Sequence, residues 1–551
     1  MELDVDGNAT GNAGPAGRGG AACRLRRFRR GEDGSLLIFS LFILVAMLMI
    51  AGMAVDLMNT ETQRARLQGT LDRAVLAGAS RDQSLDNEAV VRDYFKKAGL
   101  DAYLSSVDVT KDPTGTTVEA SAYMEVKTYF MNLLGITTLS APASGTAEER
   151  LSDVEISLIL DISGSMASRS SSSGNTKLYD LQQAANEFVE LMQCNADPGT
   201  GACTVEANSV SISLVPYAEQ VLVGESLIRQ FNVTNEHTYS SCADFSLADY
   251  ANTAISLSEP LQRAGNQDAW TSSWYTNAYD QNRTCRTDSY RTIVPYENSY
   301  TELRKRINAL RAGGYTSIDL AMKWGTALLD PAFRPVVTAL SSGPSALIDP
   351  AFAGRPFDYD RPSTQKVIVL MTDGENTQQS ALREGYREGP SPFWKNPADG
   401  RISVYNASTG RYYYPHNGTW NDEPYDGSGC YYSWWYGWVC SGATGTPVQM
   451  SYPELWQEFN VNYFKRFSWL GNPVDVYGYS DKNTRLDAIC TAAKAKGIEV
   501  FTIGFETSSA SSAIMEKCAS SPAHNFDVDG LNIDNAFASI ARQIQQLRLT
   551  N

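Results

Sequence analysis

The sequence predicts an α/β fold with a doubly wound, mostly parallel sheet, preceded by a membrane-spanning helix and a small α+β unit. From residue 153 onward, strand patterns alternate with amphipathic helix patterns, which is typical of parallel sheets. The segment 366–371 is continuously apolar after Lys366, as expected for a strand that is covered on both faces. A separate apolar run at 35–55 carries no charge and predicts a membrane span.

The predicted membrane helix covers residues 35–55, a run that can cross a hydrocarbon core of about 30 Å at about 1.5 Å per residue. A cleaved signal peptide and a buried soluble helix are the alternatives. A signal peptide has a shorter apolar core and ends at small residues, whereas this run continues into Asp56 and Leu57. Arginines without an intervening acid precede it and predict a cytoplasmic N-terminus with the rest of the chain outside. They are Arg18, Arg24, Arg26, Arg27, Arg29 and Arg30.

Three further segments complete the predicted N-terminal part. Residues 1–34 are basic and rich in Gly and Ala, which predicts a disordered cytoplasmic tail. Helix formers continue beyond the membrane and predict a stalk helix over 56–80. Residues 81–150 predict a small α+β unit, in which alternation at 116–126 indicates a strand and Gly135 a turn.

Residues 153–551 provide the predicted sheet. The strand at 154–160 is followed by an amphipathic helix at 177–193, whose apolar residues recur at spacings of three and four. Further strands are predicted at 209–217, 366–371 and 498–505, and further helices at 300–311, 317–329, 486–496 and the C-terminus. Two segments rich in Tyr, Trp, Asn and Gly interrupt the alternation as insertions, 218–299 and 378–483.

The cysteines bear on the predicted topology. Of the nine, Cys23 lies on the predicted cytoplasmic side, and an even number outside the membrane indicates disulfides. Zinc is the alternative reading, but the sequence has no C-x-x-C pair. Many connectivities are possible, and proximity in sequence suggests the pairs Cys194 with Cys203, Cys242 with Cys285, Cys430 with Cys440, and Cys490 with Cys518.

Composition excludes several classes of function. Acidic residues outnumber basic ones by 62 to 46, a net charge of −16, which argues against binding to nucleic acid. The three histidines, His237, His416 and His524, lie far apart, which disfavours histidine-based catalysis and zinc sites. The sequence has no phosphate-binding G-x-x-x-x-G-K-[ST] loop and no G-x-S-x-G nucleophile motif, so we expect no enzymatic activity.

Oxygen-bearing side chains follow two of the predicted strands. Asp161, Ser163 and Ser165 lie in DISGSM after the first strand, Asp373 lies in TDGENT after a second, and Thr316 begins a helix. Because ligands gather at the carboxyl ends of parallel strands, we expect these five residues to converge. Hydroxyls and carboxylates without Cys or His suit a divalent cation, Mg²⁺ first, with Ca²⁺ or Mn²⁺ as alternatives. Each turn alone is equally consistent with an ordinary turn or a helix cap.

The DISGSM segment resembles the D-x-S-x-S motif of von Willebrand factor type A domains, whose fold is Rossmann-like. In that family the motif forms a metal-ion-dependent adhesion site, together with a Thr from a later loop and an Asp after a central strand. The resemblance implies that Ser163, Ser165 and Thr316 coordinate the ion directly, while Asp161 and Asp373 hold its waters. It also implies an adhesive mechanism, in which an Asp or Glu carboxylate of a protein partner completes the coordination.

A second resemblance covers both ends of the chain. The segments AVDLMN, ARLQGTLDRAVLAGA and PASGTAEER resemble TadE/TadG-like pilus-assembly proteins, and TSIDLAMKWGTALLDP, QKVIVLMTDGENTQ and LDAICTAAKAKGIEVFTIGFE resemble the von Willebrand type A half of TadG-like proteins. The resemblance implies a bacterial inner-membrane component of tight-adherence (Flp-type) pilus assembly or anchoring, single-pass, with a periplasmic main domain. Its partner would be a pilin or another assembly component. A minor pilin-like subunit and a surface adhesin are the alternative functions.

The second insertion contains the aromatic segment CYYSWWYGWVC at 430–440. Such a segment can present a binding surface for a pilin, a glycan or a membrane interface, since aromatic rings supply stiff contact area. It can equally form the core of a small inserted lobe, which is the interpretation that we favour.

Overall fold

The computed structural model describes residues 34–80, 85–112, 115–150, 153–196, 201, 203, 205, 207–272, 274–344, 346–428, 430–440 and 444–550. The predicted basic tail lies outside the described residues, apart from Gly34, which begins the first helix. Cys23 lies outside them as well. The chain divides into two units, residues 1–150 and 151–551, and each is considered by itself.

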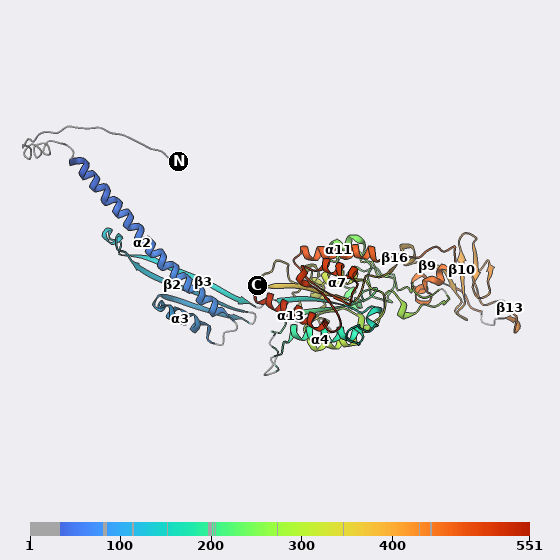
Figure 1. Cartoon of the computed structure of the whole chain (residues 1–551). Coiled ribbons are helices and arrows are strands. Elements are labelled where there is room, and N and C mark those ends of the chain that lie inside the picture. Colours follow the sequence, from blue (N-terminus) through green and yellow to red (C-terminus); the bar gives the residue numbers. More distant parts are fainter. Residues whose placement is uncertain are drawn as a thin grey trace, which may run out of the picture. The chain divides into compact units, whose positions relative to one another are not determined.

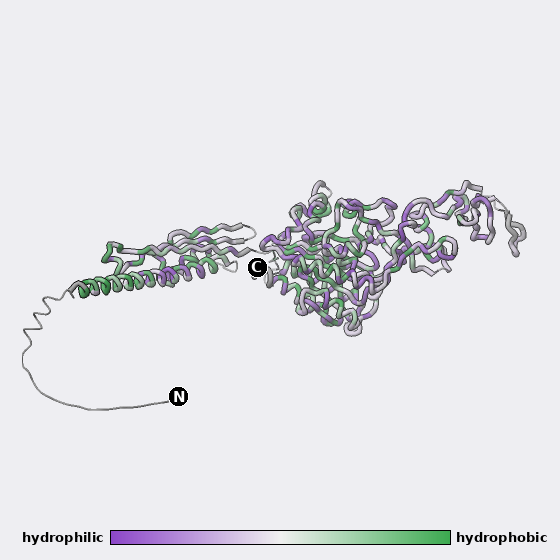
Figure 2. The backbone as a smooth tube through the Cα atoms, turned by 90° about the horizontal axis from the view of Figure 1, so that it is seen from above, coloured by the Kyte–Doolittle hydropathy of each residue, from purple (hydrophilic) through white to green (hydrophobic). Residues whose placement is uncertain are grey.

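The first unit begins with one uninterrupted helix, α2 (Gly34–Ala79). Its N-terminal half displays exposed large apolar side chains such as Phe42 and Leu48, and Figure 2 shows this half as continuously hydrophobic. Within the described residues, α2 is the one helix that is long and apolar enough to cross a membrane. Its backbone groups are paired within the helix, which is the condition for entering lipid.

The C-terminal half of α2, where the sequence predicts a stalk helix, is also a core element of the first unit. Leu67, Leu71, Ala74 and Val75 recur at helical spacing and are buried in one hydrophobic core. They pack in that core with α3 (Asn87–Ala98) and a three-stranded antiparallel sheet in the order β1-β2-β3 (Figure 1). The strands are β1 (Leu104–Asp112), β2 (Gly115–Lys127) and β3 (Thr138–Arg150).

The second unit is built on a six-stranded sheet in the order β18-β17-β7-β4-β5-β6. All neighbouring strands pair in parallel except β5 and β6, which are antiparallel. The mostly parallel sheet predicted from the sequence is therefore confirmed. Its strands are β4 (Asp153–Asp161), β5 (Val210–Tyr217), β6 (Val294–Glu297), β7 (Thr364–Thr372), β17 (Glu499–Phe505) and β18 (Asn525–Val528).

Helices cover both faces of this sheet (Figure 1). Because successive side chains of a strand point to opposite faces, Leu158 and Leu160 enter one core and Ile159 enters the other. The first core contains residues of α4 (Lys177–Gln193), α6 (Tyr300–Ala309) and α13 (Ile533–Thr550). The second contains residues of α7 (Ile318–Ala327), α8 (Arg334–Leu340), α11 (Tyr479–Ala495) and α12 (Ser509–Cys518).

The first interrupting segment, 218–299, is not a simple insertion, because its C-terminal part belongs to the main sheet. It holds the short helix α5 (Glu225–Ile228), but β6 within it forms the antiparallel edge strand of the main sheet. Residues of this segment, among them Phe231, Phe245 and Tyr250, pack into the core around α7. The segment is therefore part of the α/β unit rather than an appended loop.

The second segment, 378–483, contains a lobe with its own aromatic core. Phe393, Trp456, Phe459, Tyr463 and Phe464 are buried together, but none of them belongs to the aromatic segment 430–440. Trp434, Trp435 and Tyr436 of that segment are exposed at the turn of the β13–β14 hairpin, so the expectation that its rings form the core of the lobe is wrong for these three. The lobe's elements are β9 (Pro390–Lys395), β10 (Ile402–Asn406), β11 (Arg411–Tyr414), β12 (Thr419–Asn421), β13 (Cys430–Ser433), β14 (Gly437–Cys440), β15 (Val448–Ser451), α9 (Tyr452–Glu458) and α10 (Val461–Lys465).

The lobe joins the main unit through a two-stranded antiparallel sheet of β8 (Gln379–Leu382) and β16 (Val474–Tyr477). Disulfides connect three of the four cysteine pairs suggested by the sequence. These are Cys194 with Cys203, Cys242 with Cys285, and Cys490 with Cys518. The backbone places Cys430 opposite Cys440, but the side chains of that pair lie outside the described part of the structure.

Candidate metal centre

The DISGSM loop begins where β4 ends. Asp161 is fully buried, and its Oδ1 accepts the backbone N–H of Ser163 at 2.7 Å, which turns the chain sharply after the strand. Its Oδ2 accepts the Thr372 hydroxyl of β7 at 2.8 Å. Asp161 therefore fastens the loop to two adjacent strands at their carboxyl ends.

Four of the five expected site residues converge. The hydroxyl oxygens of Ser163 and Ser165 lie 3.0 Å apart, and the Ser165 hydroxyl donates to Asp373 Oδ1 at 2.6 Å. Ser163 and Asp373 are buried, whereas Ser165 is exposed. The cluster thus has a solvent-facing side, as a site that contacts a partner requires.

The Thr316 loop lies beside this cluster, held there by backbone hydrogen bonds. The N–H of Gly313 donates to the Ile162 carbonyl and the N–H of Gly164 donates to the Gly314 carbonyl, both at 2.8 Å. Gly314 has φ of 99°, a conformation that only glycine adopts readily. Thr316 itself is buried, but no hydrogen bond within the described residues joins its hydroxyl to the other four site residues.

The site carries surplus negative charge. Burial, and after it the nearby charge of Asp373, raise the pKa of Asp161 to about 7, against the lowering effect of the hydrogen bonds from Ser163 and Thr372. Asp373 Oδ2 is buried and accepts no hydrogen bond, although the Lys177 ammonium lies 3.3 Å away. Two desolvated carboxylates among hydroxyls fit a hard divalent cation. No group of three or more His, Cys, Asp or Glu within the described residues could hold a metal, so a site here depends on hydroxyls.

The raised pKa of Asp161 predicts a pH dependence of stability in metal-free protein. Between its ordinary value of 3.8 and about 7, the folded state retains a proton that the unfolded chain has released. The free energy of unfolding is therefore expected to fall as the pH rises through this window, by roughly 1.4 kcal/mol per pH unit at most. Urea unfolding at pH 5, 6 and 7 measures the slope.

The matched variant for this prediction is Asp161→Asn, which cannot ionise. The free energy of unfolding of this variant should fall less steeply with pH than that of the wild type, because the ionisation of Asp161 no longer contributes. Saturating Mg²⁺ should also flatten the wild-type slope, because a bound cation favours the ionised carboxylate. Equal slopes in the metal-free wild type and Asp161→Asn would contradict the prediction.

Two charged residues that lie at the site were not identified from the sequence. Lys177, the first residue of α4, lies 3.3 Å from Asp373 and 3.8 Å from Glu506. Glu506 directly follows β17 and accepts hydrogen bonds from Ser170 and Ser171. The rule that ligands gather at strand ends could have found Glu506. Lys177 looks like any polar residue at the start of an amphipathic helix.

A second charged cluster, centred on Lys482 of α11, holds the loop that contains Thr316. Lys482 of α11 is fully buried, and its ammonium donates to the Thr316 carbonyl at 2.5 Å, the Ser317 hydroxyl at 2.6 Å and the Thr377 carbonyl at 3.0 Å. Burial lowers the pKa of Lys482 to about 8, against the opposing charges of Asp319 and Glu219. Lys482 is thus a positioning residue for the loop that carries Thr316.

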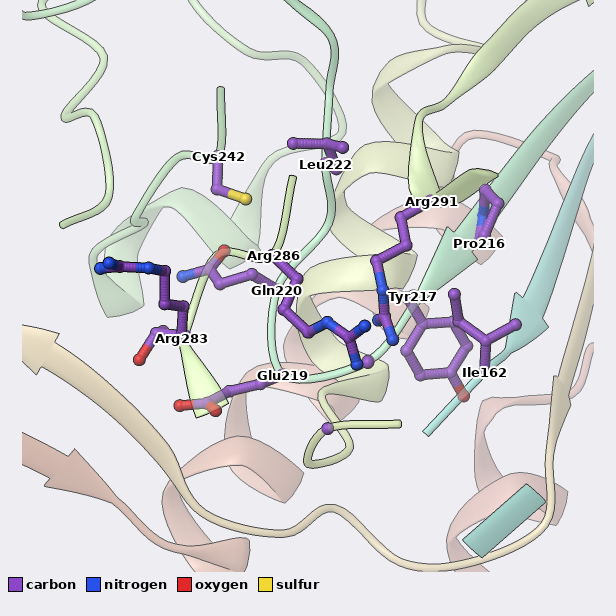
Figure 3. Close-up of a pocket in the computed structure, with 13 residues that line it drawn as sticks. Ile162, Pro216, Tyr217, Glu219, Gln220, Leu222, Cys242, Arg283, Arg286 and Arg291 are labelled. Carbon is purple, nitrogen blue, oxygen red and sulfur yellow. The ribbon is translucent and has the colours of Figure 1, made fainter. Parts of the chain in front are cut away.

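The cavity next to the loop is too small for a substrate. Ile162, Glu219, Arg286, Arg291 and Gly314 are among the residues that line it, and its volume is about 10 Å³ (Figure 3). That volume has room for about one water molecule. Figure 3 shows the guanidinium groups of Arg286 and Arg291 side by side, and Arg291 donates to the Gly313 carbonyl at 2.8 Å. This cavity therefore has no room for a small molecule larger than water.

Comparisons with known proteins give a family match at the N-terminus. Residues 34–81 match the family model described as "Putative Flp pilus-assembly TadE/G-like". No curated protein matches the chain in sequence.

Solved structures show low identity and low TM-scores. The von Willebrand factor domain of the type V pili tip protein Mfa5 from Porphyromonas gingivalis is 14% identical, over 72% of this chain and 95% of that chain, with a TM-score of 0.30. Proximal thread matrix protein 1 from the mussel byssus, with a zinc-occupied metal-ion-dependent adhesion-site motif, is 9% identical over 72% and 46%, with a TM-score of 0.26. A von Willebrand factor type A structure from Catenulispora acidiphila is 10% identical over 72% and 87%, with a TM-score of 0.15. Residues 34–81 of this chain are thus similar to the TadE/G-like segment of Flp pilus-assembly proteins, and they precede a doubly wound α/β unit.

Proposed function

We propose that this chain is a membrane-anchored, extracytoplasmic protein-binding component of Flp-type pilus assembly or anchoring, whose α/β unit contacts its partner through a divalent cation. The observation that carries the proposal is the convergence of Asp161, Ser163, Ser165 and Asp373 at the carboxyl ends of β4 and β7. The TadE/G-like match at 34–81 and the apolar half of α2 support the pilus context and the anchor.

Each residue has a separate part in the proposed contact. Ser163, Ser165 and Thr316 would hold the ion directly, and Asp161 and Asp373 would hold its waters. Asp161 also keeps the loop at the edge of the sheet through Ser163 and Thr372. The ion would supply a local positive charge to a chain whose net charge is −16, so that an Asp or Glu of the partner, a pilin or another assembly component, can approach.

Mg²⁺ is expected to stabilise the wild-type protein and to leave Ser163→Ala and Asp373→Ala nearly unaffected. Binding to the folded state alone adds about 2.7 kcal/mol to the free energy of unfolding at a concentration of 100 times the Kd. Urea unfolding of the full chain in detergent, with Mg²⁺ or EDTA, measures the difference. Retention of purified pilin on the immobilised chain should likewise require Mg²⁺.

The matched control is Ser168→Ala, in the same loop but outside the predicted ligand set, with an exposed side chain. It should respond to Mg²⁺ as the wild type does. An equal response of Asp373→Ala would show that Mg²⁺ binds elsewhere. Equal pilin retention in Mg²⁺ and EDTA would show that the contact does not use the cation.

A further inference from the structure

The turn between β2 and β3 exposes apolar side chains in a segment without charge. We call residues 129–136 the apolar turn. Leu133 is 81% and Tyr129 is 73% exposed, and Phe130, Leu134 and Ile136 are exposed as well. The sequence carries no charged residue between Lys127 and Glu148. A cluster of large exposed apolar side chains marks a surface that something covers.

Asp56 fastens this turn to α2. The carboxylate is buried and accepts the backbone N–H groups of Tyr129, Phe130 and Met131 at 2.9, 2.8 and 2.7 Å. The Phe130 ring packs on Gly52, where an added Cβ would lie only 2.5 Å from ring atoms. The apolar turn therefore lies against α2 between residues 52 and 56 (Figure 1).

This attachment sets the level of the turn along the helix. The uncharged run of α2 ends at Val55, and a rise of about 1.5 Å per residue places Gly52 roughly 5 Å inside that end. Val55, Leu57 and Met58 of α2 are exposed at the same level. The exposed surface of the turn is thus continuous with the apolar surface of the helix.

Most backbone N–H groups of the turn are already paired within the protein. Besides the three amides held by Asp56, the N–H groups of Leu133, Gly135 and Ile136 donate to the carbonyls of Phe130, Asn132 and Met131 at 3.0 to 3.1 Å. Leaving water costs less for a segment in which most backbone donors are already paired, whereas each unpaired amide in an apolar medium is costly.

We infer that the apolar turn is a second membrane contact, with its side chains in the boundary between headgroups and acyl chains of the leaflet from which α2 emerges. The inference rests on the proposed anchoring of the chain by α2. Lipid is the occupant because the turn continues the lipid-facing surface of the helix, and because Tyr and neighbouring apolar residues suit the interface. Two adjacent contacts would restrict how the first unit tilts on the membrane.

Tryptophan fluorescence can test this contact in the full chain. All ten native tryptophans lie between Trp270 and Trp469, so a tryptophan added to the first unit reports through the difference from wild type. Leu133→Trp places the probe at the most exposed position of the turn. Tyr123→Trp is the matched control, exposed on β2 and roughly 20 Å farther along the strand. Both proteins are reconstituted in vesicles of phosphatidylcholine, either plain or brominated on the acyl chains.

The added emission of Leu133→Trp is expected to be blue-shifted and quenched by brominated lipid, while that of Tyr123→Trp is not. Emission that is blue-shifted without quenching would show that protein, such as a second copy, covers the turn, and would overturn the inference. Equal quenching in the two variants would overturn it as well. Vesicle flotation distinguishes failure of this inference from failure of the proposed anchoring. If the chain floats with the vesicles but the tryptophan at position 133 is not quenched, only the membrane contact of the turn is refuted. If the chain does not float, the anchoring by α2 is refuted as well.

Discussion

Replacing Lys482 with methionine is expected to lower the free energy of unfolding of the α/β unit by about 3–5 kcal/mol, the usual cost of removing one member of a buried charge cluster. The ammonium satisfies the carbonyls of Thr316 and Thr377, and its charge opposes those of Asp319 and Glu219. Methionine is similar in length but supplies neither a donor nor a charge. The variant should therefore also respond less to Mg²⁺, because the Thr316 loop loses its support.

Urea unfolding of the full chain in detergent measures this loss. Tryptophan fluorescence reports on the α/β unit alone, since every native tryptophan lies there. The control is Lys517→Met, which breaks an exposed ion pair with Asp487 and should cost no more than about 1 kcal/mol. A loss for Lys482→Met as small as that of the control would show that the buried cluster contributes little to stability.

Removing the disulfide between Cys242 and Cys285 by a double change to alanine is expected to destabilise the α/β unit by about 4 kcal/mol. The bond closes a loop with a sequence separation of 43 residues, and the chain-entropy relation gives about that value for such a loop. Both cysteines are buried beside Leu222 and Ala264, so the segment 218–299 would also lose its fixed place against the core.

The disulfide between Cys194 and Cys203 provides a matched comparison. Its separation of 9 residues predicts a smaller loss, about 2.6 kcal/mol by the same relation. The two double-alanine variants are compared by urea unfolding under oxidising conditions. A larger loss for the shorter loop would show that loop closure in the unfolded chain does not dominate the effect.

Much of the fold of the second unit could be predicted from local pattern. After Lys366 the strand at 366–371 is apolar on both faces, which predicts that both faces are covered, and 154–160 precedes an amphipathic helix that can cover one of its faces. Asp161, Ser163, Ser165 and Asp373 could be grouped because residues that follow adjacent parallel strands meet at one edge. Their separation in sequence does not prevent this grouping, because β4 and β7 are neighbouring parallel strands in the sheet.

Contacts between residues that are distant in sequence could be seen only in the structure. The pattern at 56–80 predicts a stalk helix, and only packing shows that Leu67 and Leu71 of this helix are buried in one core with a sheet that begins at Leu104. Lys482 supports Thr316 through a backbone carbonyl, and every residue has one, so no sequence motif marks the contact. The same is true of Asp56, whose partners are backbone amides more than 70 residues away.

The sequence by itself determined the apolar helix, the mostly parallel sheet and the strand ends where the candidate site lies, because these depend on periodicity and on residue type. Only the tertiary structure decided which charged residues surround and support the site, and that the apolar turn is held beside α2. These depend on which distant backbone groups come within hydrogen-bonding distance, and that is settled by packing of the whole unit rather than by the residues themselves.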